Sequence, residues 1–141
     1  MLKAALIGLG GMGQGHLVEY LKMEKRGVPV ELVAICDLDR EKLNGKAITI
    51  NLNFDDMKAD FSKYRAYTDV DELFEKETEL DYVDIVLPTY LHAEVAMKAF
   101  KKGLHVMCEK PMALRPEDCE KMIEASKAAG KKLMIGQCLR F

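Results

Sequence analysis

The chain has 141 residues, of which 49% are hydrophobic and 31% are charged, and its formal net charge is −2 at pH 7. This composition predicts one globular domain with an ordinary hydrophobic core. It offers no basic face for nucleic acid or an anionic membrane, and no apolar run approaches the roughly 20 residues of a membrane span. The four cysteines lie far apart without a C-x-x-C pair, which supports neither a disulfide framework nor a metal site.

The first apolar run, Leu2–Ile7, is typical of a buried parallel strand and leads directly into a glycine-rich turn. Its early start leaves no room for a signal peptide, so we expect a cytoplasmic protein. The glycines at 8, 10 and 13 form G-x-G-x-x-G between a predicted strand and a predicted helix, which is the context of a dinucleotide site.

Each glycine of the turn has a separate predicted task. Gly8 would permit the tight turn, Gly10 would let the backbone approach a pyrophosphate, and Gly13 would let the helix pack on its strand. The free amide groups and the positive dipole end at the helix start would hold the phosphates. The alternative to a dinucleotide site is a glycine-rich turn that only connects a strand to a helix.

The next elements are a helix that ends near Gly27 and a second buried strand, Val30–Cys36. Asp37 follows this strand, about where a dinucleotide fold places the carboxylate that binds the adenosine ribose hydroxyls. The alternative is that Asp37 caps a short helix, Leu38–Leu43. The two interpretations are compatible.

The segment Asn44–Tyr64 has no clear pattern, although Ile48–Phe54 alternates like an edge strand, and we interpret the whole segment as an inserted excursion. A short strand is predicted near Arg65–Tyr67. The helix after it should begin at Thr68, whose hydroxyl would cap the first turn.

Three more buried strands, each followed by a helix or a turn, complete the pattern: Tyr82–Leu87, Leu104–Cys108 and Leu133–Gly136. Strands that alternate with helices predict right-handed crossovers and a doubly wound open parallel sheet, a Rossmann fold with strand order 3-2-1-4-5-6. Ligands bind such sheets at the carboxyl ends of the strands. The residues that follow the predicted strands there are Gly8, Asp37, Pro88, Thr89, Glu109, Lys110 and Gln137.

Four motifs make the chain similar to one family. They are Gly8–Gly13 with His16, Pro88–His92, Glu109–Pro111, and Gly136–Phe141. With them the chain resembles the N-terminal domain of the glucose-fructose oxidoreductase / inositol dehydrogenase (Gfo/Idh/MocA) family of NAD(P)-dependent oxidoreductases. The glycine motif is widespread, whereas Glu-Lys-Pro after the fifth strand is much more selective.

The resemblance implies that Lys110 is the active-site lysine beside the nicotinamide and the reacting carbon. A lysine shielded from water there can help move the hydroxyl proton when hydride leaves an alcohol carbon. A solvated surface lysine is the alternative. Glu109 would hold the nicotinamide ribose, and Pro88, Thr89 and His92 would line the cofactor's path, although His92 could instead only start a helix. His16 is expected to be structural. The full set of predicted cofactor-binding residues is Gly8, Leu9, Gly10, Gly11, Met12, Asp37, Pro88, Thr89, His92, Glu109, Lys110 and Gln137.

The resemblance also implies a cofactor and a substrate class. The cofactor would be NAD, with Arg40 and Lys42 beside Asp37 leaving NADP as an alternative, and the substrate would be a sugar or polyol-like molecule. Family members continue into a second domain that supplies substrate contacts. We therefore expect residues 1–141 to be the cofactor domain alone, inactive by itself and able to self-associate through the surface the second domain would cover. A stand-alone nucleotide-binding module without catalysis is the alternative function.

Overall fold

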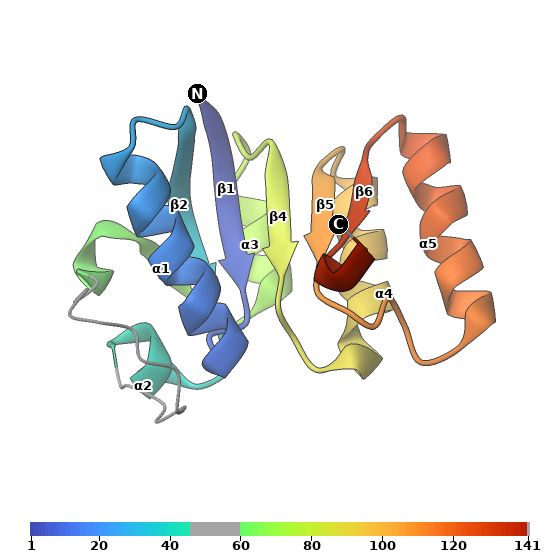
Figure 1. Ribbon diagram of the computed structural model, residues 1–141, viewed down its shortest axis with the longest axis horizontal. Coiled ribbons are helices and arrows are strands. Elements are labelled where there is room, and N and C mark those ends of the chain that lie inside the picture. The colour runs from blue at the N-terminus through green and yellow to red at the C-terminus, as the bar shows by residue number, and fades with distance from the viewer. Residues whose placement is uncertain (46–59, 141) are drawn as a thin grey trace.

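A computed structural model describes residues 1–45 and 60–140, and its centre is a six-stranded parallel sheet with the order β3-β2-β1-β4-β5-β6 (Figure 1). This confirms the predicted fold class and strand order. The strands are β1 (Leu2–Ile7), β2 (Val30–Cys36), β3 (Arg65–Tyr67), β4 (Tyr82–Ile85), β5 (His105–Cys108) and β6 (Leu133–Ile135).

Helices connect successive strands and cover the sheet from both sides. In Figure 1, α1 lies in front of β1 and β2, whereas α3 and α4 lie behind the sheet. The helices are α1 (Gly11–Lys25), α2 (Arg40–Leu43), α3 (Val70–Lys76), α4 (Thr89–Lys101) and α5 (Pro116–Ala129), with short 3-10 turns η1 (Phe61–Lys63) and η2 (Cys138–Arg140). Among the described residues, no helix combines the length and the apolar character that crossing a lipid bilayer requires.

Strand β1 is buried on both of its faces, which explains its nearly continuous apolar sequence. On one face Leu6 packs with Leu17 of α1 and Ile35 of β2. On the other face Ala5 and Ile7 join the larger cluster under α3, α4 and α5. Because β1 lies in the middle of the sheet, the glycine turn that follows it lies at the middle of the carboxyl edge.

Two predicted helix starts differ in detail from the structure. Helix α2 is capped by Asp39, whose side chain accepts the Glu41 amide, and not by Asp37. Helix α3 is capped by Asp69 and not by the Thr68 hydroxyl, because the Asp69 carboxylate is the group that reaches the Glu72 amide. The edge strand predicted at 48–54 lies outside the described residues.

Candidate functional site

The first and third glycines of the turn after β1 are required by close packing. Gly8 has φ 101°, and a Cβ atom there would lie 2.3 Å from the carbonyl oxygen of Val86. A Cβ atom on Gly13 would lie 1.9 Å from the carbonyl oxygen of Gly8. At Gly10, in contrast, a Cβ atom would meet no other group within 4 Å. The turn is therefore packed against β4 while Gly10 faces open space, which is the shape that an approaching pyrophosphate needs.

The N-terminus of α1 is suited to an anion. Its cap residue, Gly10, has no side chain to accept the first amide groups, and the first turn contains no acidic residue. The helix dipole and the amides of this turn therefore favour a negatively charged group. Leu9 is buried beneath the turn, Gly11 is half-buried, and the Met12 side chain is exposed beside it.

Asp37 is joined to the glycine turn by a hydrogen bond. The Leu9 amide donates to Oδ2 at 2.7 Å, and the Asp39 amide donates to Oδ1 at 2.9 Å. The ammonium of Lys42 lies 3.4 Å from Oδ1. These contacts fix the carboxylate at the end of β2, and its remaining lone pairs can accept ribose hydroxyls.

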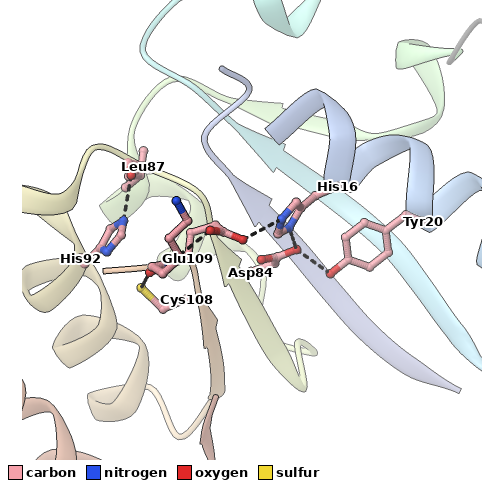
Figure 2. Close-up of polar contacts among 8 residues, drawn as sticks. His16, Tyr20, Asp84, Leu87, His92, Cys108 and Glu109 are labelled. Atoms are coloured by element: carbon pink, nitrogen blue, oxygen red, sulfur yellow. Dashed lines mark hydrogen bonds and ion pairs between the residues drawn. The ribbon is translucent and has the colours of Figure 1, made fainter. Parts of the chain in front are cut away.

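The turn after β4 leads into α4, which begins with Pro88 as its cap and Thr89 as its first residue. The buried ring of His92 lies in the first turn of this helix. Pro88 is exposed at the carboxyl edge and Thr89 is half-buried. His92 is 0% exposed, and its Nδ1 lies 2.9 Å from the carbonyl oxygen of Pro111. Its Nε2 lies 2.8 Å from the carbonyl oxygen of Leu87 (Figure 2). The ring therefore connects the turn after β4 with the turn after β5, because each of its nitrogens contacts a backbone carbonyl of one of these turns.

The turn after β5 presents Glu109 and Lys110. Glu109 is half-buried, and its Oε2 accepts the Lys110 amide at 3.1 Å. Lys110 is exposed and precedes a cis peptide bond to Pro111. The described residues leave this lysine exposed and do not supply the shielding that the sequence predicted for it. Gln137 is exposed just after β6, at the same edge.

Sequence reasoning missed the contribution of Asp84 and His16. His16 Nδ1 lies 2.8 Å from Oδ2 of Asp84, and Nε2 lies 3.3 Å from Oε1 of Glu109 (Figure 2). The hydrogen bond to Asp84 raises the pKa of His16, with further contributions from the charges of Asp84 and Glu109. An acid in the middle of the apolar run Tyr82–Leu87 was the available signal, because buried carboxylates are rare unless they are paired.

Two cysteines end strands of the site, and neither is reactive. Burial raises the pKa of Cys36 and of Cys108 to about 12, so both thiols stay protonated at neutral pH. The residues that the structure describes also contain no cluster of acids, histidines or cysteines that could hold a metal ion.

Known proteins resemble this chain in sequence over almost its whole length. A sequence model described as an oxidoreductase family with an NAD-binding Rossmann fold matches residues 2–137. The 2,7-anhydro-N-acetylneuraminate hydratase of Mediterraneibacter gnavus is 31% identical over 97% of this chain and 32% of its own length. The inositol 2-dehydrogenase of Salmonella typhimurium is 32% identical over 99% of this chain and 38% of its own length.

A solved structure has a similar fold. The WlbA dehydrogenase from Bordetella pertussis, in complex with NADH and UDP-GlcNAcA, matches with a TM-score of 0.81 at 26% identity, over 99% of this chain and 36% of that one. The chain thus spans about a third of the length of the curated relatives it matches.

Proposed function

Since the chain belongs to the oxidoreductase family with an NAD-binding Rossmann fold, we propose that it binds NAD for hydride transfer to or from a sugar or polyol-like substrate. The observation that carries the proposal is the common edge of the glycine turn and Lys110. A Cβ atom on Gly10 would meet no group within 4 Å, so the space beside it is free for a ligand. At the same edge Lys110 is exposed, and it precedes Pro111, whose carbonyl oxygen contacts His92.

Each residue of the edge has a role in this proposal. The amides at the start of α1 hold the pyrophosphate, Asp37 accepts the hydroxyls of the adenosine ribose, and Glu109 accepts those of the nicotinamide ribose. The bound nicotinamide supplies the hydride acceptor or donor. Lys110 takes the proton of the substrate hydroxyl in one direction and returns it in the other.

The experiment removes the ammonium of Lys110 in the complete product of the gene. Lys110→Met should lower turnover of the responsive sugar or polyol by about 10²–10⁴-fold, the usual contribution of a positioned proton-transfer group. Lys102→Met is the matched control, because Lys102 is also exposed but ends α4 at the opposite edge of the sheet. Full turnover by Lys110→Met would remove Lys110 from the mechanism.

A second candidate reaction comes from the relative named as a hydratase. The same cofactor domain would then serve an addition of water to an anhydro sugar with no net change in NADH. Measuring the product and the NADH absorbance in the same reaction distinguishes the two candidate reactions. Only a dehydrogenase forms reduced cofactor in proportion to its product.

A further inference from the structure

His16 lies in α1, one turn after the glycines, and its ring bridges two carboxylates. Nδ1 faces Oδ2 of Asp84 at 2.8 Å and Nε2 faces Oε1 of Glu109 at 3.3 Å. An ionised carboxylate only accepts hydrogen bonds, and a neutral imidazole donates from one nitrogen alone. Both contacts are therefore satisfied together only by the doubly protonated ring.

Asp84 needs a positive partner because it is almost completely buried, with 1% of its surface exposed. Its Oδ2 also lies 3.3 Å from the hydroxyl of Tyr20, which bonds in turn to the hydroxyl of Tyr82 at 3.0 Å. Burial and the charge of Asp84 raise the pKa of Tyr20, so that hydroxyl stays protonated. Oδ1 of Asp84 has no hydrogen-bond partner among the described residues. His16 is thus the basic side chain that faces this acid, with Nδ1 2.8 Å from Oδ2.

Glu109 is held in place by groups on three sides. His16 contacts Oε1, and the amide of Lys110 donates to Oε2. Gly136, just after β6, leaves the space that Oε1 needs, because a Cβ atom there would lie 2.8 Å from that oxygen. In Figure 2 the carboxylate of Glu109 points toward His16, and Asp84 and Tyr20 lie on the far side of the ring. The orientation of the Glu109 carboxylate therefore depends on His16.

We propose that His16 is a positioning residue that, as an imidazolium, holds Glu109 for the cofactor, so that NAD affinity decreases as the pH rises and the ring loses its proton. This inference rests on the proposed function, in which Glu109 binds the nicotinamide ribose. The neutral ring keeps the shorter bond to Asp84 and turns a nitrogen lone pair toward the Glu109 carboxylate. The carboxylate is then repelled and loses its orientation.

The groups that act on His16 come from three elements. Asp84 on β4 and Glu109 after β5 both stabilise the charged ring, and burial opposes them. On α1 itself the charge of His16 acts on Glu19, whose carboxylate is already paired with Lys22. The hydrogen bond to Asp84 is the largest of these effects, so the pKa of His16 lies above its ordinary value of 6.5. NAD affinity should therefore decrease at pH values above 6.5, where His16 loses its proton.

The first experiment measures NAD⁺ binding to the 141-residue chain by calorimetry between pH 6 and pH 9. The dissociation constant should rise about tenfold over this range, which corresponds to a change of one unit in the pKa of His16 between the free and bound chain. His16→Gln, which cannot titrate, should bind with the weaker constant at every pH. His105→Gln is the matched control, because His105 contacts the Lys132 amide at the other end of β5, and it should keep the pH dependence.

A second variant tests the position of Glu109 without changing His16. Gly136→Ala places a methyl group against the carboxylate, so the chain should bind NAD⁺ at pH 6 about as weakly as the wild type does at pH 9. NMR titration of the three histidine rings identifies the protonation step of His16 directly and reports whether each variant is folded.

The outcomes separate the two proposals. Binding that does not depend on pH while His16 titrates, or His16→Gln with the wild-type pH dependence, overturns the positioning role and leaves the proposed function intact. No binding of NAD⁺ at any pH overturns both.

Discussion

We predict that Asp37 decides the choice between the two nicotinamide cofactors. Its carboxylate, 9% exposed, lies where the adenosine ribose is expected and would be repelled by a 2′-phosphate. We expect NADH to bind at least about tenfold more tightly than NADPH, because like charges brought together in a binding site cost on the order of several kcal/mol. Calorimetry with both cofactors measures the ratio, and tighter binding of NADPH would contradict the prediction.

A variant of the same acid tests the physical reason. Asp37→Ser removes the negative charge and leaves the ammonium of Lys42 in place, so the preference should fall or reverse. Asp39→Ser is the control, because a serine keeps an oxygen that can cap α2 and changes the charge by the same amount. An unchanged ratio in Asp37→Ser would show that another group sets the choice.

Gly10 is the residue whose substitution separates binding from folding. Its φ of −65° is accessible to any residue, and a Cβ atom there meets nothing within 4 Å. Gly10→Val should therefore fold with nearly normal stability and lose NAD⁺ binding, because the side chain fills the space of the pyrophosphate. Circular dichroism, thermal unfolding and calorimetry on the same sample check both parts.

Gly13→Ala supplies the contrast. A Cβ atom at Gly13 would lie 1.9 Å from a backbone oxygen, so this variant should lose stability itself. A folded Gly10→Val chain with unchanged NAD⁺ affinity would mean that the turn is purely structural.

At the scale of elements, β3 and α3 are joined by one carboxylate. Glu77 follows α3 and is buried, and its oxygens accept Nε and Nη2 of Arg65 at 2.5 and 2.6 Å. The hydroxyl of Tyr67 also donates to Glu77 at 2.5 Å. The hydrogen bond from Arg65 is the main reason that the pKa of Glu77 is lowered. This joint fixes the short edge strand β3 beside β2.

Glu77→Gln should lower the free energy of unfolding by about 1–3 kcal/mol at pH 7, the range for a buried polar group that loses its partner. The folded-state pKa lies below that of the unfolded chain, so the carboxylate stabilises the fold above the unfolded value of about 4.3. This stabilisation is lost as the pH falls through the folded-state pKa.

Urea unfolding at several pH values should thus show the wild type and Glu77→Gln converging in acid. Glu72→Gln is the control, because its pair with Lys76 is exposed to water and contributes little to stability. A constant difference between wild type and Glu77→Gln at all pH values would assign the effect to packing and not to charge.

At the scale of the whole molecule, the exposed position of Lys110 predicts that the 141-residue chain binds cofactor without turning over substrate. Orientation of the reactants accounts for about 7–11 kcal/mol of barrier lowering in favourable cases, and exclusion of water adds to it. NADH absorbance in a screen of sugars and polyols checks this. Robust dehydrogenase activity of the 141-residue chain would contradict the prediction.

The open face of the sheet predicts self-association of the short chain. Figure 1 shows α1 in front of β1 and β2, whereas among the described residues only the short 3-10 turn η2 lies in front of β5 and β6. Met134 of β6 is 55% exposed, and a large exposed apolar area favours association. Sedimentation should detect concentration-dependent dimers that Met134→Lys weakens. Ile123→Lys, at another exposed apolar residue, should leave them unchanged, and a chain that is monomeric at all concentrations would contradict the prediction.

The sequence by itself determined the fold and predicted the edge of the sheet at which a ligand would bind. Apolar runs such as Leu2–Ile7 predicted parallel strands, because strands buried on both faces need apolar side chains at nearly every position. The spacing of glycines between a strand and a helix predicted where a dinucleotide binds, because the backbone of that turn must satisfy local steric limits. Apolar runs and glycine spacing involve residues that are close together in the chain, so they can be recognised in the sequence alone.

Only the tertiary structure decided which polar groups meet across the carboxyl edge. His16, Asp84 and Glu109 lie far apart in the chain and come together because β1, β4 and β5 are arranged side by side. The burial of His92 between two carbonyl oxygens depends in the same way on how α4 packs. Contacts between distant segments depend on register and packing, and a single sequence read along the chain contains no measure of either.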